Sequence, residues 1–92
     1  MKPYDNNTSV TVIDEHGSLQ TFYLLTDKLS KTRFVRFTNK LDEADSIEWH
    51  FKYHGHPLTL QYDIYNGVTL APHTSKDVTA ATKLAVKLRQ AV

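Results

Sequence analysis

The sequence predicts an α+β fold: one antiparallel sheet of five to six short strands, mostly a meander, with a single C-terminal amphipathic helix packed on one face. Two patterns carry this prediction. Apolar and polar residues alternate between Ile47 and Ile64 on both sides of a glycine-containing turn, which is typical of a hairpin. After Thr74, apolar residues recur at helical spacing. The chain has 92 residues, of which 40% are hydrophobic, so it has room for one domain with a thin core.

The first half of the chain carries weaker signals. Residues 1–7 are polar and are expected to form a flexible arm, so that residues 8–92 make up the single domain. Segments rich in β-branched and aromatic residues then predict three strands, at 8–14, 19–26 and 33–38.

The strands of the second half, 47–53, 58–64 and 68–71, can be paired through their turns. A two-residue loop that begins at Gly55 brings the apolar faces of its two strands together. A three-residue loop that ends at Gly67 does the same for the next turn, with this glycine in a left-handed conformation. These loops predict the opposed pairs Trp49–Tyr62, Phe51–Leu60, Tyr53–Leu58, Ile64–Val68 and Tyr62–Leu70.

The C-terminal helix is expected to begin after Thr74 and to run for about 17 residues. Thr74 is a capping residue type, and Asp77 three positions later can complete a capping box. The apolar stripe that should face the sheet consists of Val78, Ala81, Leu84, Ala85, Leu88, Ala91 and Val92.

Composition excludes several classes of protein. The formal net charge of +1 is not typical of a nucleic-acid-binding or membrane-binding chain. The absence of cysteine excludes disulfide scaffolds and thiolate metal sites, and it favours a cytoplasmic location. The polar start and the lack of a long apolar run predict neither a signal segment nor a membrane span. No cofactor motif is present, so no cofactor is expected.

The leading functional prediction is a small non-catalytic interaction domain that binds another protein or forms a homodimer. The segments 19–26 and 33–38 are apolar on both faces when they are treated as strands, so one helix cannot cover them. Surplus apolar surface on a small domain often marks an interface. The expected contact residues are Phe22, Leu24, Phe34 and Phe37, with Arg33 and Arg36 at the rim.

Two alternatives belong to other functional classes. Residues 28–40 carry five basic residues and no acidic one, which suggests nucleic-acid binding through Lys31, Arg33, Phe34, Arg36 and Lys40. A catalytic site would use Glu48, His50 and Asp63, which the predicted register places close together on the polar face of the hairpin. The five histidines lack a convincing set of metal ligands, so no metal site is expected.

Overall fold

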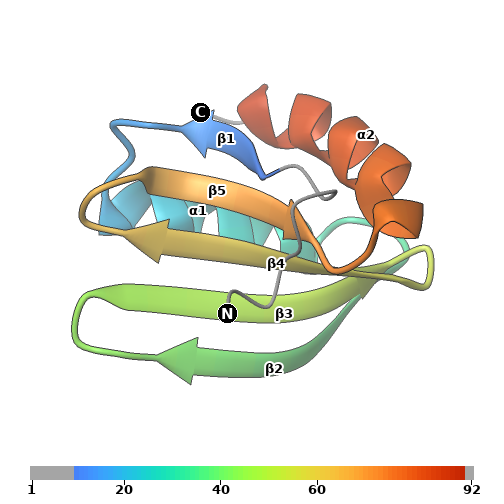
Figure 1. Ribbon diagram of the computed structural model, residues 1–92, viewed down its shortest axis with the longest axis horizontal. Coiled ribbons are helices and arrows are strands. Elements are labelled where there is room, and N and C mark those ends of the chain that lie inside the picture. The colour runs from blue at the N-terminus through green and yellow to red at the C-terminus, as the bar shows by residue number, and fades with distance from the viewer. Residues whose placement is uncertain (1–9, 91–92) are drawn as a thin grey trace.

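A computed structural model describes residues 10–90 and confirms the α+β class, the antiparallel sheet and the C-terminal helix. Five strands form one sheet in the order β1-β5-β4-β3-β2, and every neighbouring pair is antiparallel (Figure 1). The elements in chain order are β1 (Thr11–Asp14), α1 (Leu19–Ser30), β2 (Val35–Asp42), β3 (Ser46–Tyr53), β4 (His56–Asp63), β5 (Gly67–Pro72), the 3₁₀ turn η1 (Ser75–Asp77) and α2 (Val78–Arg89).

The strand predicted at 19–26 is wrong, because this segment forms the first part of helix α1. Ser18 caps the helix by accepting a hydrogen bond from the backbone N–H of Thr21 at 3.3 Å. Phe22, Leu25 and Leu29 follow at spacings of three and four, and all three are fully buried. The apolar residues of this segment therefore follow a helical period, although Phe22 to Leu25 also forms a continuous apolar run.

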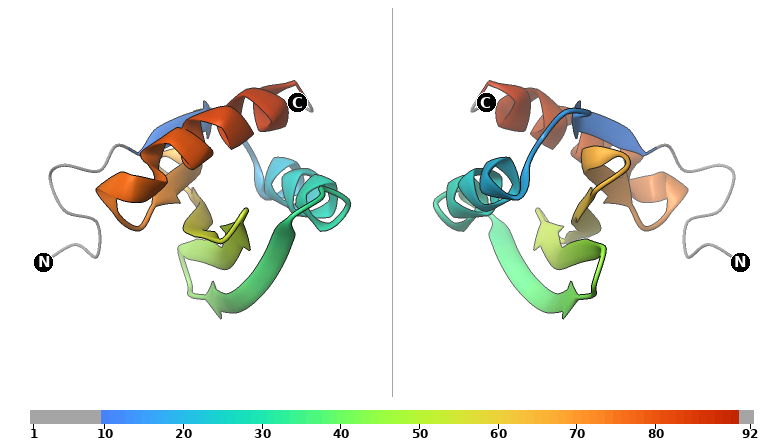
Figure 2. Two further views of the ribbon diagram at one scale, coloured as in Figure 1. Left: turned by 90° about the vertical axis from the view of Figure 1, so that its right-hand side faces the viewer. Right: turned by 90° about the vertical axis from the view of Figure 1, so that its left-hand side faces the viewer.

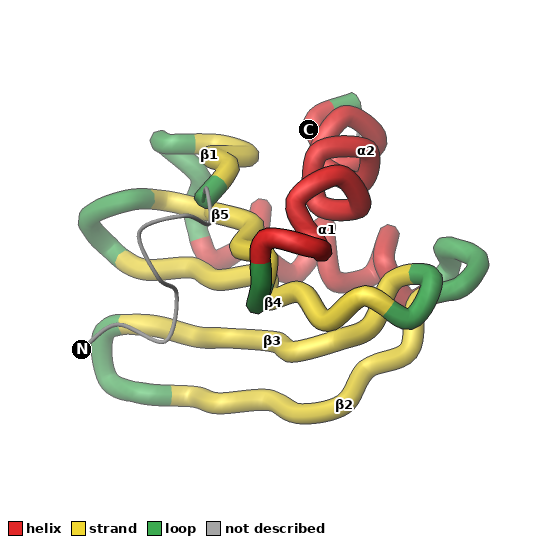
Figure 3. Tube along the Cα trace, turned by 45° about the vertical axis from the view of Figure 1, so that its right-hand side comes forward, coloured by secondary structure: helices red, strands yellow, loops and turns green. Residues whose placement is uncertain are grey.

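Both helices pack against the same face of the sheet, and the sheet curves around α1 (Figures 2 and 3). Helix α1 connects β1, at one edge of the sheet, to β2, at the other, so it must cross this concave face. Helix α2 packs over β1 and β5. Phe22 and Leu25 of the segment 19–26 are thus core residues of a helix, whereas Leu19, Tyr23 and Leu24 stay partly exposed. The buried cluster comprises Ile13, Phe22, Leu25, Leu29, Phe51, Tyr53, Leu58, Leu60, Val68, Leu70, Ala81, Leu84, Ala85 and Leu88.

The β3–β4 hairpin forms as expected, but its register differs from the prediction by two residues. Trp49 lies opposite Leu60, because the two-residue loop consists of His54 and Gly55. Their φ angles are 52° and 81°, the left-handed values that a type I′ turn requires. A shift of two residues keeps every side chain on its expected face, so the hydrophobic pattern alone does not distinguish the two registers.

The β4–β5 hairpin shows the same difference. Tyr62 pairs with Val68 rather than with Leu70, whereas Gly67 has the expected left-handed φ of 72°. This turn is closed by Asp63, whose carboxylate accepts the backbone N–H groups of Tyr65 and Asn66 at 2.8 and 2.7 Å. The sequence pattern identified the turn glycine but not the aspartate that sets the loop.

The predicted capping box at the start of the C-terminal helix is confirmed. The Asp77 carboxylate accepts the backbone N–H of Thr74 at 3.0 Å, and one 3₁₀ turn precedes α2. The helix then buries Ala81, Leu84, Ala85 and Leu88, as the apolar stripe predicts. The remaining stripe residues Ala91 and Val92, the arm 1–7 and the first two residues of the predicted strand 8–14 lie outside the described residues.

Candidate functional site

The structure does not bring the six expected contact residues together. Phe22 is fully buried in the core, so it cannot touch a partner of the folded chain. Leu24, on the opposite side of α1, is 51% exposed, and Phe34, in the loop before β2, is 65% exposed. Phe37 is half-buried on the concave face of β2. Arg33 and Arg36 are exposed, but they lie in the loop and in β2 rather than around one patch.

A different apolar surface lies between α1 and β2. Three aromatic side chains, Tyr23, Phe37 and Trp49, are grouped there, and we call them the aromatic shelf. The ring centroids of Tyr23 and Trp49 are 6.4 Å apart, and those of Phe37 and Trp49 are 5.3 Å apart, with the rings steeply inclined in both pairs. Tyr23 is 46% exposed, while the other two rings are half-buried. Leu19, one helical turn before Tyr23, is 41% exposed and extends the apolar surface.

The shelf borders the free edge of strand β2. This strand is eight residues long and pairs only with β3 in the described part of the chain. Its pairing is interrupted at Thr38, where the register shifts between Phe37 and Asn39. Lys40, just after this bulge, places its ammonium 4.0 Å above the ring of Trp49, in cation–π geometry. The other edge, β1, has only four residues, and the side chain of Arg89 donates to its Val12 carbonyl at 2.9 Å.

The basic segment 28–40 does not form one continuous surface. Arg36 lies beside Lys52 on the face of the sheet that the helices leave uncovered, whereas Lys40 lies on the concave face. Lys31 follows α1, where it forms an exposed ion pair with Asp27 at 3.1 Å. Strand alternation alone would place Arg36 and Lys40, four positions apart, on one face; the bulge at Thr38 shifts the register and places them on opposite faces.

The carboxylates and histidine expected to form a catalytic group are also separated in part. Glu48 pairs with Gln61, and Asp63 pairs with Ser46, so the predicted opposition of the two acids is wrong. The pKa of Asp63 reflects its role in the turn: burial alone would raise it, but the hydrogen bonds from Asn66 and Tyr65 outweigh burial and lower it. Asp63 is therefore a structural residue of the β4–β5 turn.

Glu48 and His50 do meet, and they belong to a longer chain of hydrogen bonds. His50 Nε2 lies 3.2 Å from the Glu48 carboxylate, and Thr59 Oγ1 lies 3.1 Å from His50 Nδ1 and 2.7 Å from His73 Nε2. With both imidazoles neutral, His73 donates to Thr59, Thr59 to His50, and His50 to Glu48. His73 and Thr59 are 14 residues apart in sequence, so only the folded sheet brings them together.

The hydrogen-bonded side chains Thr59, His50 and Glu48 have the order of a nucleophile, a base and a carboxylate, but Thr59 has 0% exposure. Its hydroxyl already donates and accepts a hydrogen bond, which leaves it poorly placed to attack a substrate. Burial first, and then the repulsion that a protonated His50 would exert, lower the pKa of His73 and so favour its neutral form. We therefore infer that the hydrogen bonds among Glu48, His50, Thr59 and His73 stabilise the face of the sheet on which no helix packs.

One further histidine pair lies at the start of α2. His56 Nδ1 donates to Asp77 Oδ1 at 2.9 Å, since a carboxylate can only accept. Burial alone would raise the pKa of Asp77, but hydrogen bonds from His56 and Thr74 outweigh it and lower the pKa. Across residues 10–90, no group of three or more potential ligand side chains is arranged to hold a metal ion.

Within the same residues, neither helix is long and apolar enough to cross a membrane. No protein family model matches the chain, and comparisons with curated proteins and with solved structures found no similar protein.

Proposed function

We propose that this protein is a non-catalytic interaction domain that pairs with a second copy of itself through the aromatic shelf and the neighbouring edge of β2. The observation that carries the proposal is the grouping of Tyr23, Phe37 and Trp49, partly exposed, beside a strand edge with no partner among residues 10–90. Tyrosine and tryptophan are enriched among the residues that dominate binding energy in protein interfaces.

The shelf and the edge support each other physically. A strand added to β2 would satisfy backbone groups that otherwise face water, and its side chains on the concave side would lie along the shelf. Covering a large aromatic side chain removes apolar area that contributes roughly 25 cal/mol per Å². Aromatic pairs across the contact contribute about 0.5–1.5 kcal/mol beyond that area.

Charge does not oppose this pairing. The formal net charge is only +1, so two copies repel each other weakly at physiological salt. Strand β2 carries Arg36, Lys40 and the bulge at Thr38, features that limit indiscriminate edge pairing. A second copy offers Asp42 near the end of the same strand as a counter-charge. The edge therefore favours a partner with defined charges over random aggregation.

The proposal is tested by comparing two substitutions of matched exposure. Tyr23→Ser removes a shelf ring that is 46% exposed, and Val86→Ser alters a residue on α2 that is 51% exposed. By sedimentation equilibrium we expect Tyr23→Ser to weaken association by at least tenfold, because a hot-spot side chain contributes about 2 kcal/mol or more. Val86→Ser should associate like the parent protein. Equal association constants for the two variants, both folded by circular dichroism, would contradict the proposal.

The proposal also places the protein in the cytoplasm, on the basis that the chain contains no cysteine. It assigns no reaction to the protein, because the hydrogen-bonded chain at His50 centres on a hydroxyl without solvent access.

A further inference from the structure

A basic cleft lies where the C-terminal ends of α1 and α2 approach each other. It has a volume of about 450 Å³ and is lined by Lys28, Lys31, Thr32, Lys87 and Gln90. Three of its five lining residues are lysines, which come from two helices far apart in the sequence. Lysines in the last turn of a helix stabilise the helix through a favourable interaction with its dipole, so their position alone does not indicate a ligand.

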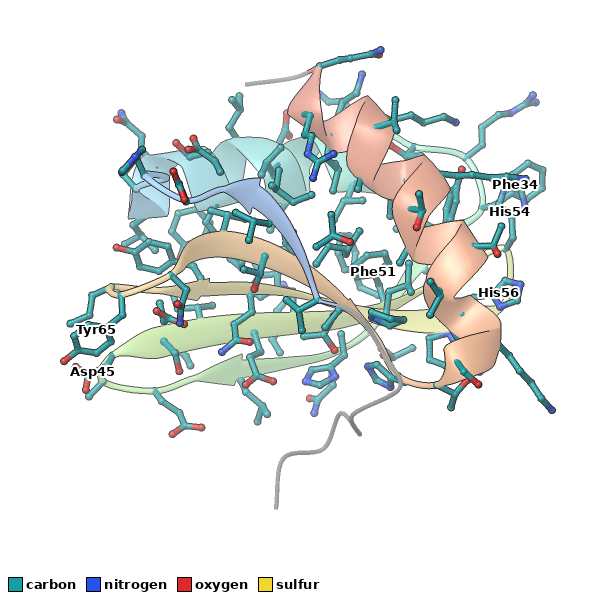
Figure 4. All side chains as sticks on the ribbon, turned by 45° about the horizontal axis from the view of Figure 1, so that its top comes forward. Phe34, Asp45, Phe51, His54, His56 and Tyr65 are labelled. Carbon is teal, nitrogen blue, oxygen red and sulfur yellow. The ribbon has the colours of Figure 1, made fainter. Side chains whose placement is uncertain are left out.

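Two exposed rings next to this cleft provide an independent observation. Phe34 is 65% exposed and stacks on His54, with ring centroids 4.4 Å apart and planes inclined by 26° (Figure 4). The φ angle of Phe34 is 66°, a left-handed value that is unfavourable for a bulky residue. The backbone N–H of His54 holds this conformation by donating to the Phe34 carbonyl at 3.0 Å. The fold thus maintains a strained backbone that presents an aromatic ring to solvent, a feature that often marks functional sites.

The rings and the cleft are adjacent, and the buried ring of Tyr53 lies between them. His54 contacts Tyr53 with a centroid separation of 4.5 Å, and the Tyr53 hydroxyl lies 3.4 Å from the ammonium of Lys87 in the cleft. On the other side, Thr32 of the cleft is separated from Phe34 only by Arg33. We call this surface the basic–aromatic end.

Most of the positive charge of this end has no counter-charge within the described residues. Asp27 pairs with Lys31, but among residues 10–90 no carboxylate lies within ion-pair distance of Lys28, Arg33 or Lys87. The acidic residues Asp42, Glu43 and Asp45, which follow the basic segment 28–40 in sequence, lie where β2 ends and β3 begins, and Figure 4 shows Asp45 far from Phe34 and His54. The fold therefore separates the basic and acidic segments that are adjacent in sequence.

We propose that the basic–aromatic end binds single-stranded nucleic acid, with backbone phosphates at the lysines of the cleft and an unstacked base on Phe34. Positive charge beside an exposed ring is the combination that binds single strands without reading sequence. A duplex keeps its bases stacked on each other, so it cannot place one on Phe34. This site differs from the segment 28–40 because it excludes Arg36 and Lys40 and includes Lys87.

The test is fluorescence anisotropy with a short labelled oligothymidylate, with protein up to about 0.1 mM, the weak end of non-specific nucleic-acid binding. We expect saturable binding. The logarithm of the association constant should fall with the logarithm of the salt concentration at a slope of about −2, as for three phosphate contacts on a single strand. Phe34→Gly removes the ring and eases the backbone, so the fold is kept; affinity should fall at least about fivefold. A Lys28→Gln, Lys87→Gln double variant should reduce the salt slope by about 1.4, whereas Lys76→Gln on η1 should leave it unchanged.

Several outcomes would overturn the proposal. One is the absence of binding at low salt. Another is equal affinity for a duplex or for polyglutamate of the same length, since neither a duplex nor an acidic peptide supplies an unstacked base. A third is unchanged binding by Phe34→Gly, which would remove the aromatic ring from the site.

Discussion

Replacing Asp77 by alanine should destabilise the protein substantially, because this nearly buried carboxylate holds the start of α2 in place. The Asp77 side chain is 5% exposed and accepts three hydrogen bonds: from the Thr74 backbone N–H at 3.0 Å, the Thr74 hydroxyl at 2.8 Å and His56 Nδ1 at 2.9 Å. It therefore joins three separate segments: the loop after β5, the start of α2 and the first residue of β4.

The magnitude follows from those bonds. Loss of a helix cap costs about 1 kcal/mol. A hydrogen bond to a charged group contributes about 1.5–3 kcal/mol, and the lower value applies to His56 because its side chain is 42% exposed and water can replace the carboxylate. The sum of about 2–3 kcal/mol is a large share of the roughly 5–14 kcal/mol expected for a domain of 92 residues. The melting temperature should fall by about 10–20 °C.

Urea unfolding at neutral pH measures this change, with Asp27→Ala as the control. Asp27 pairs with Lys31 on the surface of α1 and is 62% exposed, so its removal should cost no more than about 0.5 kcal/mol. A cost below about 1 kcal/mol for Asp77→Ala, or equal costs for the two variants, would refute the reasoning from the three bonds.

The stability that Asp77 supplies should depend on pH in a defined direction. The pKa of Asp77 in the folded protein lies below the ordinary value of 3.8, so the unfolded chain takes up the proton first as pH falls. The stability that Asp77 supplies is present above pH 3.8 and is lost as pH drops through its folded pKa. The difference between the parent protein and Asp77→Ala should therefore shrink on acidification; a difference that stays constant would contradict the lowered pKa.

Three further predictions test the structure. Phe22→Ser should cost about 3–5 kcal/mol while Leu24→Ser stays within about 1 kcal/mol, because the two side chains lie on opposite sides of a helix; similar losses in urea unfolding would instead indicate a strand. Phe34→Gly should be more stable than Phe34→Ala by about 1 kcal/mol, since both lose the ring but only glycine favours a φ of 66°; equal thermal midpoints would argue against the left-handed backbone. Gly67→Ala should cost more than about 1 kcal/mol, because φ is 72° and the added Cβ would collide with the Asp14 carbonyl, and chemical denaturation showing no loss would refute this turn geometry.

The parts of the fold that follow a local pattern were predictable from the sequence. The capping box at Thr74 and Asp77, the buried stripe of α2 and the left-handed Gly67 each depend on residues a few positions apart. The helix at 19–30 was not predicted, because aromatic residues and threonine, taken one at a time, favour strands. The burial of Phe22, Leu25 and Leu29 at helical spacing, with Ser18 as the cap, is the signal that was missed.

The candidate surfaces were harder to predict than the elements. Treating 19–26 as a strand put Phe22 and Leu24 on one face, whereas the helix buries one and exposes the other. The aromatic shelf joins Tyr23 of α1 to Trp49 of β3, and the basic–aromatic end joins Lys28 to Lys87. Such contacts depend on how α1 crosses the concave face, which no periodicity within one segment encodes.

The central claim, pairing of two copies through the shelf and β2, is tested most directly by the solution mass of the parent protein. Light scattering on a sizing column, over a range of loading concentrations, gives this mass without reference to shape. Pairing of two copies predicts a mass that rises with concentration to twice the chain mass of 10.6 kDa. A mass that stays at 10.6 kDa at every concentration would contradict it.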